Sequence, residues 1–260
     1  MLSLISVEFR RIIALTLRYP ANFISSLFIS TLMFYGLFMG AQYLSNQQVF
    51  GKNLDAMIVG YAAWVLATKG LNKTPMAIQN EADTGVLESI FLSSYNKSVI
   101  FLARALSESL VDIVLIVIMV GVLVWITGSQ VEFPLALALP TATLVLAAVG
   151  LGMTMGALAL QVKRVGAMLP SLQMMLLLLM FTPFETWTTG LASGLASLAM
   201  WLPMVPSVLL LRELMAYGHP FDPTLALKAV ANGVGYVALS MVIFNLMAKR
   251  VRSKGLLAGY

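Results

Sequence analysis

The chain is built around apolar runs that are long enough to cross a membrane. The run LVDIVLIVIMVGVLVWI, residues 110–126, contains a single charged residue. Because a helix needs about 20 apolar residues to span the hydrocarbon core of a bilayer, such runs indicate transmembrane helices. The composition agrees, since 60% of the 260 residues are hydrophobic and 10% are charged, against about 25% charged residues in soluble domains. We therefore predict an all-α polytopic membrane protein in which residues 1–260 form a single transmembrane domain.

The apolar runs predict six spans, and the basic residues predict their orientation. The spans cover residues 22–44, 54–71, 106–126, 135–160, 168–184 and 229–248. With this count, all but three of the 16 Lys and Arg residues fall on one side of the membrane, the three being Lys52, Arg212 and Lys228. Because cytoplasmic loops are rich in Lys and Arg, we expect a multi-pass protein of the cell inner (plasma) membrane with both termini in the cytoplasm. Orientation in the lipid bilayer also explains the net charge of +5, so we predict no nucleic-acid partner.

The first 20 residues predict an amphipathic helix at the cytoplasmic surface of the bilayer. Apolar and small residues recur every three or four positions on one face, namely Leu2, Ile5, Phe9, Ile12, Ile13 and Thr16. Arginines lie on another face, and Pro20 would end the helix. A helix of this kind can lie in the interface. The alternative is a plain basic flank that only sets the orientation.

The segment 185–228, between the last two spans, is apolar but interrupted. Pro183 precedes it, and glycines and prolines break it at Gly190, Gly194, Pro203 and Pro206. The uninterrupted run 191–202 has about 12 residues and is too short to cross. We predict a re-entrant or interfacial hairpin on the outer side, with Trp187, Trp201 and Tyr217 at the membrane surface.

The fourth span carries small residues at a regular spacing of four. Ala148, Gly152 and Gly156 lie on one helical face. Small residues at this spacing allow two helices to approach closely within a membrane. This pattern predicts a tight helix–helix contact.

The chain lacks the usual signatures of catalysis and of ligand chemistry. It has no cysteine, a single histidine (His219, in an expected loop), no GxxxxGK[ST] loop for ATP, and no hydrolase or metalloprotease motif. We therefore predict no catalytic residues, no metal site, no cofactor bound by this chain, and no enzymatic activity of its own.

Two acidic residues at the start of the third span are the remaining candidates for buried chemistry. Glu108 and Asp112 are four residues apart on one helical face, and Arg104 lies four residues before Glu108. A structural pairing of Arg104 with Glu108 is one interpretation, and a proton or ion relay is the other. Glu185 could be an ordinary interfacial acid or could line an outer exit.

The cytoplasmic segment 72–97 contains an acidic stretch, EADTGVLESIF, at 81–91. Pro75 can begin a helical turn, and Gly85 can end or break a helix. After Gly85, the apolar residues Val86, Leu87, Ile90 and Phe91 share one face of a short helix. Such a helix could dock in the groove of a partner protein, or it could be a solvated loop with one face on the membrane.

This stretch resembles the first cytoplasmic loop of ABC transporter type-2 export permeases. Their pattern is an acid, then Gly-x-Leu-Glu, then a Leu-rich stretch and a Ser/Pro turn, and the chain has Glu81 followed by Gly85-Val86-Leu87-Glu88. The resemblance extends to the six spans, the interfacial N-terminus and the broken apolar hairpin. The turn at 93–95 departs from the pattern, because many relatives have proline there.

The resemblance implies a transport subunit that pairs with a second permease copy, as a homodimer or a heterodimer, and docks on a separate ABC ATP-binding subunit. ATP and Mg²⁺ would be bound by that partner. Glu81, Gly85, Leu87 and Glu88 would form the coupling helix at the ATPase interface. The outer hairpin would close the exit path, and its candidate residues are Phe184, Glu185, Trp187 and Trp201.

The expected function is ATP-driven export of a hydrophobic or amphiphilic substrate, a drug-like molecule or a lipid, by alternating access. The 17 methionines suit a varied apolar cargo. Export of a lipid-linked polysaccharide or a teichoic-acid precursor is an alternative within the family. A secondary transporter or channel without an ATPase is an alternative of another class, but the middles of the predicted spans contain no charges.

Overall fold

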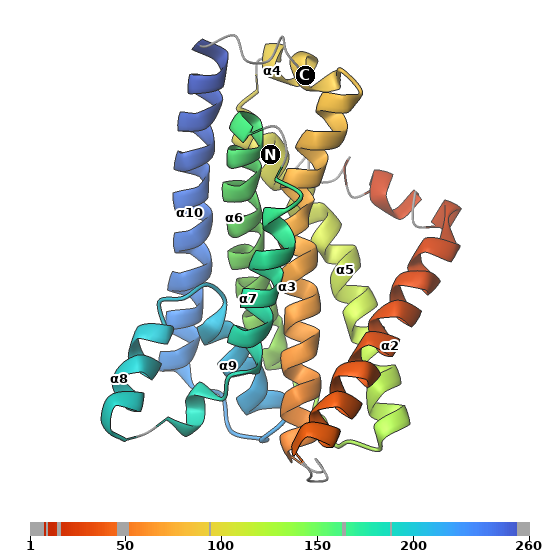
Figure 1. Ribbon diagram of the computed structural model, residues 1–260, viewed down its shortest axis with the longest axis vertical. Coiled ribbons are helices and arrows are strands. Elements are labelled where there is room, and N and C mark those ends of the chain that lie inside the picture. The colour runs from red at the N-terminus through yellow and green to blue at the C-terminus, as the bar shows by residue number, and fades with distance from the viewer. Residues whose placement is uncertain are drawn as a thin grey trace.

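The computed structural model describes residues 8, 10–14, 17–45, 52–93, 95–162, 165–187 and 189–253. Within these residues the secondary structure is entirely helical (Figure 1). The predicted all-α class is therefore confirmed. Residues 8, 10–14, 17 and 18 are helical, but the remaining residues of the predicted interfacial helix lie outside the described part of the chain. That helix stays a prediction.

Five of the described helices are long and apolar enough to cross a membrane. They are α2 (Pro20–Ser45), α3 (Lys52–Asp83), α5 (Lys97–Thr127), α6 (Ala138–Val162) and α10 (Pro223–Ser253). A 3-10 turn, η1 (Leu135–Leu137), leads into α6. The multi-pass membrane class follows from these helices. The two ends of the molecule are named here the α4 end and the α8 end, after the short helices that Figure 1 shows there.

The predicted fifth span is shorter in the structure. The helix α7 covers Met168–Phe181, which is 14 residues. It is followed by η2 (Phe184–Thr186), α8 (Gly190–Ala199) and α9 (Val205–Met215). Helices of 10 and 11 residues are too short to cross a bilayer. The count of six spans and the re-entrant hairpin thus remain predictions.

The helix α3 continues well beyond the span expected from the sequence. We expected the span to end at residue 71 and Pro75 to begin a new helical turn. Instead, α3 runs without a break from Lys52 to Asp83, with Pro75 inside it. Its 32 residues correspond to about 48 Å of helix, so a single rod joins the two ends of the molecule.

The central helix α6 lies very close to α3, as its small residues predict. A Cβ atom added to Gly152 would lie 2.7 Å from the carbonyl oxygen of Gly70 and 2.8 Å from that of Leu71. One added to Gly156 would lie 2.5 Å from the methyl group of Thr74. The two backbones therefore approach as closely as glycine allows, which strengthens packing between membrane helices.

The helix α6 meets α10 in the same way on another side. A Cβ atom on Gly150 would lie 2.8 Å from the carbonyl carbon of Tyr236, and one on Gly233 would lie 2.8 Å from the carbonyl oxygen of Thr143. By contrast, α2 leans away from the rest of the bundle toward the α4 end (Figure 1), and most of its most apolar stretch is exposed. The core is thus a tight α3–α6–α10 assembly with α2 at its edge.

We predict that Gly152→Ala lowers the free energy of unfolding by about 1–3 kcal/mol, because the new methyl group forces the two backbones apart. Gly121→Ala in α5 is the matched control, since a Cβ atom there meets nothing within 4 Å. Thermal unfolding of the purified protein, followed by tryptophan fluorescence, measures both. Equal melting temperatures for the two variants would contradict the close approach.

Candidate functional site

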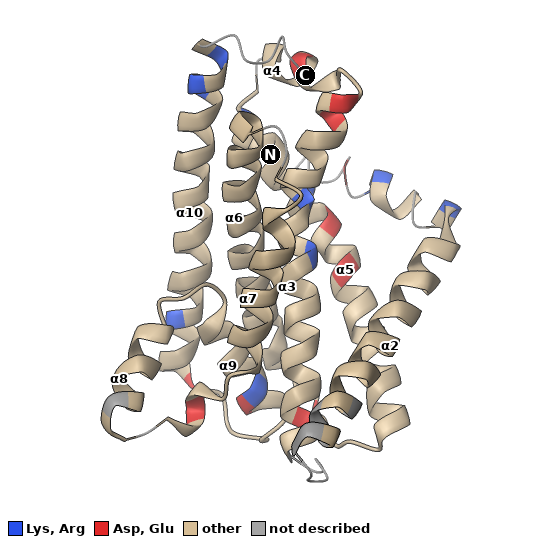
Figure 2. Ribbon diagram, viewed as in Figure 1, with Lys and Arg blue, Asp and Glu red and all other residues tan. Residues whose placement is uncertain are grey.

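A short helix follows Gly85 and packs against the long helix α3. Gly85 has a φ of 71°, a left-handed conformation that glycine adopts without strain, and it separates α3 from α4 (Val86–Leu92). Leu87 and Phe91 are buried, whereas Glu88 is exposed. Val86, which we predicted on the same apolar face, is exposed, as is Leu92. Figure 2 shows acidic residues in red at this end of the molecule.

An ion pair connects the end of α3, which precedes α4, to α5. Arg104 contacts the carboxylate of Glu81, and its Nε lies 3.7 Å from a carboxylate oxygen of Glu8. Pairing of Arg104 with Glu108, four residues further along the same helix, was one interpretation of the sequence, but Arg104 pairs with Glu81 on the neighbouring helix instead. The Glu81 side chain is therefore paired and largely buried, so it is not a free surface acid.

The turn between α4 and α5 is stabilised by local hydrogen bonds. Asn96 is the N-cap of α5, and its side chain accepts a hydrogen bond from the backbone N–H of Ser98 at 3.2 Å. Lys97 donates to the carbonyl oxygen of Tyr95 at 2.9 Å. Ser94, in the turn that departs from the family pattern, lies outside the described residues.

A group of four charged residues connects α3 and α5 further along the bundle. Lys73 lies 2.7 Å from Asp112 and 3.3 Å from Glu108, and Lys69 lies 3.4 Å from Asp112. The structural pairing of the two acids is thus present, but with the lysines of α3. We had counted both lysines on the cytoplasmic side, Lys69 at the end of a span that finished at residue 71 and Lys73 beyond it, and both lie within the continuous helix α3.

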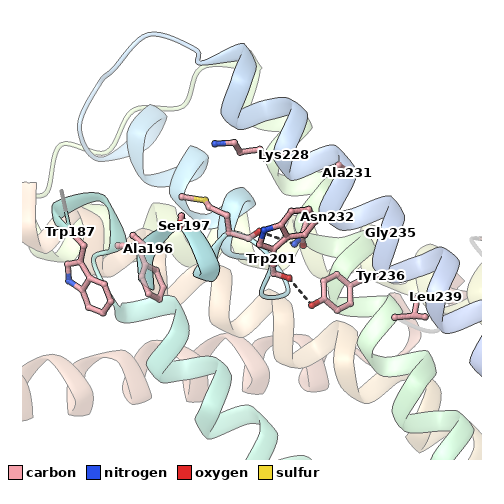
Figure 3. A pocket seen from close by; sticks show the side chains of 12 residues that line it. Trp187, Ala196, Ser197, Trp201, Lys228, Ala231, Asn232, Gly235, Tyr236 and Leu239 are labelled. Carbon is pink, nitrogen blue, oxygen red and sulfur yellow. Dashed lines mark hydrogen bonds between the residues drawn. The ribbon is translucent and has the colours of Figure 1, made fainter. Parts of the chain in front are cut away.

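At the α8 end, three of the four predicted outer residues line one pocket. Phe184, Trp187 and Trp201 face α10 across a cavity of about 650 Å³ (Figure 3). The ring centroids of Phe184 and Trp187 are 5.2 Å apart in an edge-to-face arrangement. The α10 wall contributes Lys228, Asn232 and Tyr236, among others. The pocket is mainly apolar, with a few polar groups on one side.

Hydrogen bonds to α10 hold the loop that closes this pocket. Tyr236 donates to the carbonyl oxygen of Trp201 at 3.0 Å (Figure 3). Asn232 donates to the carbonyl oxygen of Leu202, also at 3.0 Å. Met204 has a φ of 69°, which is rare for a residue other than glycine, and its N–H donates to Asn232 at 3.1 Å. Asn232 thus supports a strained turn at the start of α9.

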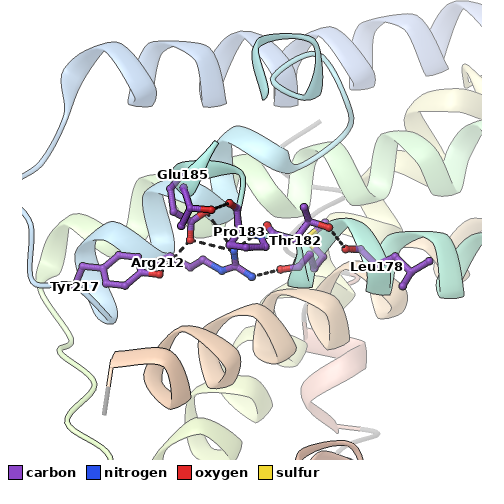
Figure 4. Close-up of polar contacts among 8 residues, drawn as sticks. Leu178, Thr182, Pro183, Glu185, Arg212 and Tyr217 are labelled. Carbon is purple, nitrogen blue, oxygen red and sulfur yellow. Dashed lines mark hydrogen bonds and ion pairs between the residues drawn. The ribbon is translucent and has the colours of Figure 1, made fainter. Parts of the chain in front are cut away.

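The fourth predicted residue, Glu185, lies in a polar cluster around Arg212. Arg212 donates to a carboxylate oxygen of Glu185 at 3.3 Å and to the carbonyl oxygen of Thr182 at 3.1 Å (Figure 4). It also contacts the carbonyl oxygen of Met180, and Tyr217 donates to Glu185 at 3.2 Å. Glu185 therefore fixes the end of α7 to α9. Tyr217 is half-buried in this cluster.

Burial and neighbouring charge shift two pKa values at this end. Burial, followed by the Glu185 carboxylate, raises the pKa of Tyr217. Burial also raises the pKa of Glu213, while the charge of His219 lowers it in part. Both shifts reflect the low polarity of the region between α9 and the loop that follows it.

The sequence did not identify Arg212 as the centre of this cluster. We counted it only as a cation on the outer side, although it interrupts the apolar run VPSVLLLRELM. In the structure its side chain is 4% exposed. Gly60 of α3 makes room for it, since a Cβ atom there would lie 3.0 Å from the guanidinium. A single arginine within an apolar helix is the signal that could have found this site.

Residues 3–215 match the family described as ABC-2 type transporter. The chain belongs to the ABC-2 type transporter family. The match extends from the N-terminal segment to the end of α9 and so includes α4 and the Arg212 cluster. A comparison with curated proteins gives no match. As an ABC-2 family member with several membrane-spanning helices, the chain is a transport permease of an ABC system.

For this ABC-2 permease, we predict that Arg212→Gln lowers the free energy of unfolding by about 3 kcal/mol or more, because it leaves the Glu185 carboxylate and two carbonyl groups without their cation. Lys228→Gln removes an exposed cation at the same end and serves as the control. Chemical denaturation of both proteins in detergent gives the comparison. A loss below about 1 kcal/mol for Arg212→Gln, as expected of a surface ion pair, would show that the cluster is not structural.

Proposed function

We propose that this chain is the membrane subunit of an ATP-driven exporter, and that α4 is the element on which a separate ATP-binding subunit acts. The supporting observation is the construction of α4. Leu87 and Phe91 of α4 are buried and the helix packs on α3, whereas Glu88 is exposed together with Val86 and Leu92. A supported helix that exposes one acid and two apolar side chains is suited to a groove in a partner that has apolar walls and a basic group.

Displacement of α4 would reach the opposite end through α3. The Glu81–Arg104 pair joins α3 and α5 next to α4, so a force on α4 acts on both helices. Because α3 is continuous and packs on α6 along much of its length, it would tilt as a nearly rigid body. Its far end contacts Arg212 through Gly60, and motion there would change the outer pocket. This series of movements is a form of alternating access.

The proposal assigns ATP and Mg²⁺ to the partner subunit. It also includes a second copy of this permease or a related one. The face of α2 with Ile24, Phe28 and Leu32 is more than 60% exposed at each position. Lipid covers part of such a surface, and a second permease would cover the remainder in a dimer.

The outer pocket supports a hydrophobic or amphiphilic substrate. Its aromatic side chains would contact an apolar body, while Lys228 and Asn232 on the α10 wall would bind a polar head. The aromatic faces of Trp187 and Trp201 also suit the flat faces of sugar rings. A lipid-linked polysaccharide is therefore the second candidate substrate.

We predict that Glu88→Arg weakens the complex with the ATP-binding subunit, because it reverses the charge of the exposed face of α4. The expected result is at least a tenfold weaker association, corresponding to about 1.4 kcal/mol, and a similar loss of ATP-dependent export from proteoliposomes. Co-purification and a transport assay with a fluorescent amphiphile measure the two effects.

Glu132→Arg is the matched control, because Glu132 is an exposed acid at the α8 end, near Gly218. It should leave the association with the ATP-binding subunit unchanged. If Glu88→Arg retained full association and full transport, α4 would not be the docking element.

A further inference from the structure

The four-charge group between α3 and α5 borders an open cleft of about 440 Å³. The cleft lies where α2 leans away from the bundle, and Figure 2 shows basic residues on α3 and acidic residues on α5 at that height. Its rim includes Arg11 and Tyr19 from the N-terminal segment and Asn22 from the first turn of α2. Phe23 and Leu115 form an apolar part of its wall. No part of the export mechanism proposed above uses this cleft.

The cleft contains acidic and basic side chains, and side chains of both kinds can form further hydrogen bonds. Of the two carboxylate oxygens of Glu108, Oε2 alone lies within ion-pair distance of a cation among the described residues, and this side chain is 32% exposed. Lys69 makes two long contacts, 3.4 Å to Asp112 and 3.3 Å to the hydroxyl of Ser26. An ammonium group can donate three hydrogen bonds, so Lys69 can still bind an anion.

Arg11 provides a second cation at the rim. Among the described residues it forms an ion pair with Glu8 at 3.1 Å, and a guanidinium has five N–H donors. The cleft is therefore lined by donors from Lys69 and Arg11 and by an acceptor from Glu108. A ligand that carries a phosphate and an ammonium group a few bonds apart matches this arrangement.

The depth of the cleft indicates the source of such a ligand. Lys73 lies ten residues before the end of α3 at Asp83, which is about 15 Å along the helix axis. The cleft is thus level with the start of the apolar stretch of α2. We infer that the headgroups of membrane lipids lie at this level. The exposed apolar side chains of α2, such as Ile24 and Phe28, continue from it and would contact acyl chains.

We propose that this cleft binds the headgroup of a phospholipid with a primary amine, of the phosphoethanolamine type, from the leaflet on the α4 side. The phosphate would accept hydrogen bonds from Lys69 and Arg11, and the ammonium group would donate to Glu108. Charge-assisted hydrogen bonds of this kind are stronger than neutral ones. The lipid would fill the gap between α2 and α5 and fix the position of α2. This binding does not depend on the identity of the exported substrate.

The test compares phospholipids with identical acyl chains and different headgroups. Native mass spectrometry of the delipidated protein gives the apparent Kd for phosphatidylethanolamine, phosphatidylcholine and phosphatidylglycerol. We expect phosphatidylethanolamine to bind about tenfold more tightly than the trimethylated lipid, whose nitrogen cannot donate to Glu108. Equal binding of the first two lipids, or tighter binding of phosphatidylglycerol, would overturn the proposal.

Two variants locate the preference in the cleft. Glu108→Gln should abolish the difference between the two zwitterionic lipids, whereas Glu132→Gln, at the other end of the molecule, should preserve it. Arg11→Gln should weaken both zwitterionic lipids by a similar factor, because it removes a phosphate contact. A preference that survives Glu108→Gln in a protein with an unchanged melting temperature would place the lipid elsewhere.

A competition experiment distinguishes a membrane lipid from a soluble compound as the ligand. Glycerophosphoethanolamine carries the same headgroup without acyl chains. If it competes poorly with the lipid, the acyl chains contribute to binding and the ligand is a membrane lipid. If it binds as tightly as the lipid, the cleft still recognises the phosphate and the amine, but the assignment to a membrane lipid is wrong.

Discussion

The contact of α3 with α6 is the constraint on which the remaining structure depends. Within a membrane, apolar side chains gain little by leaving lipid for protein, so helices associate through close packing. Gly152 and Gly156 allow this packing, since any larger residue would meet backbone or side-chain atoms of α3. The same helix α6 approaches α10 at Gly150. The three helices therefore form a framework to which the other elements attach.

The helix α3 contributes residues to three groups of polar contacts, each at a different level of this framework. At one end, Gly60 provides the space in which Arg212 fixes the outer segment. Further along, Lys69 and Lys73 pair with the acids of α5. At the other end, Glu81 binds Arg104 beside α4. A continuous helix with these attachments can transmit a displacement between the two ends, and this is the mechanical basis of the proposed coupling.

The sequence predicted the local features of this structure well. Apolar runs located the long helices, Gly85 marked the break between α3 and α4, and the spacing of Gly152 and Gly156 predicted a close helix pair. The extension of α3 beyond residue 71 was missed, because Lys73 and Pro75 are residues typical of a loop. The charges of Lys69 and Lys73 are compensated by acids of α5. The partners of Arg104 and Arg212 are 23 and 27 residues away, so their pairing depends on tertiary packing.

The most direct test is to ask which surface of this permease contacts the ATP-binding subunit. The sequence contains no cysteine, so single cysteines can be labelled without background. We would introduce Ser89→Cys on the exposed face of α4 and Ser197→Cys on the exposed face of α8, attach a photoreactive group, and cross-link within the complex. The account predicts a cross-link to the ATP-binding subunit from position 89 and none from position 197. A cross-link from position 197 alone, or from neither position in an intact complex, would contradict it.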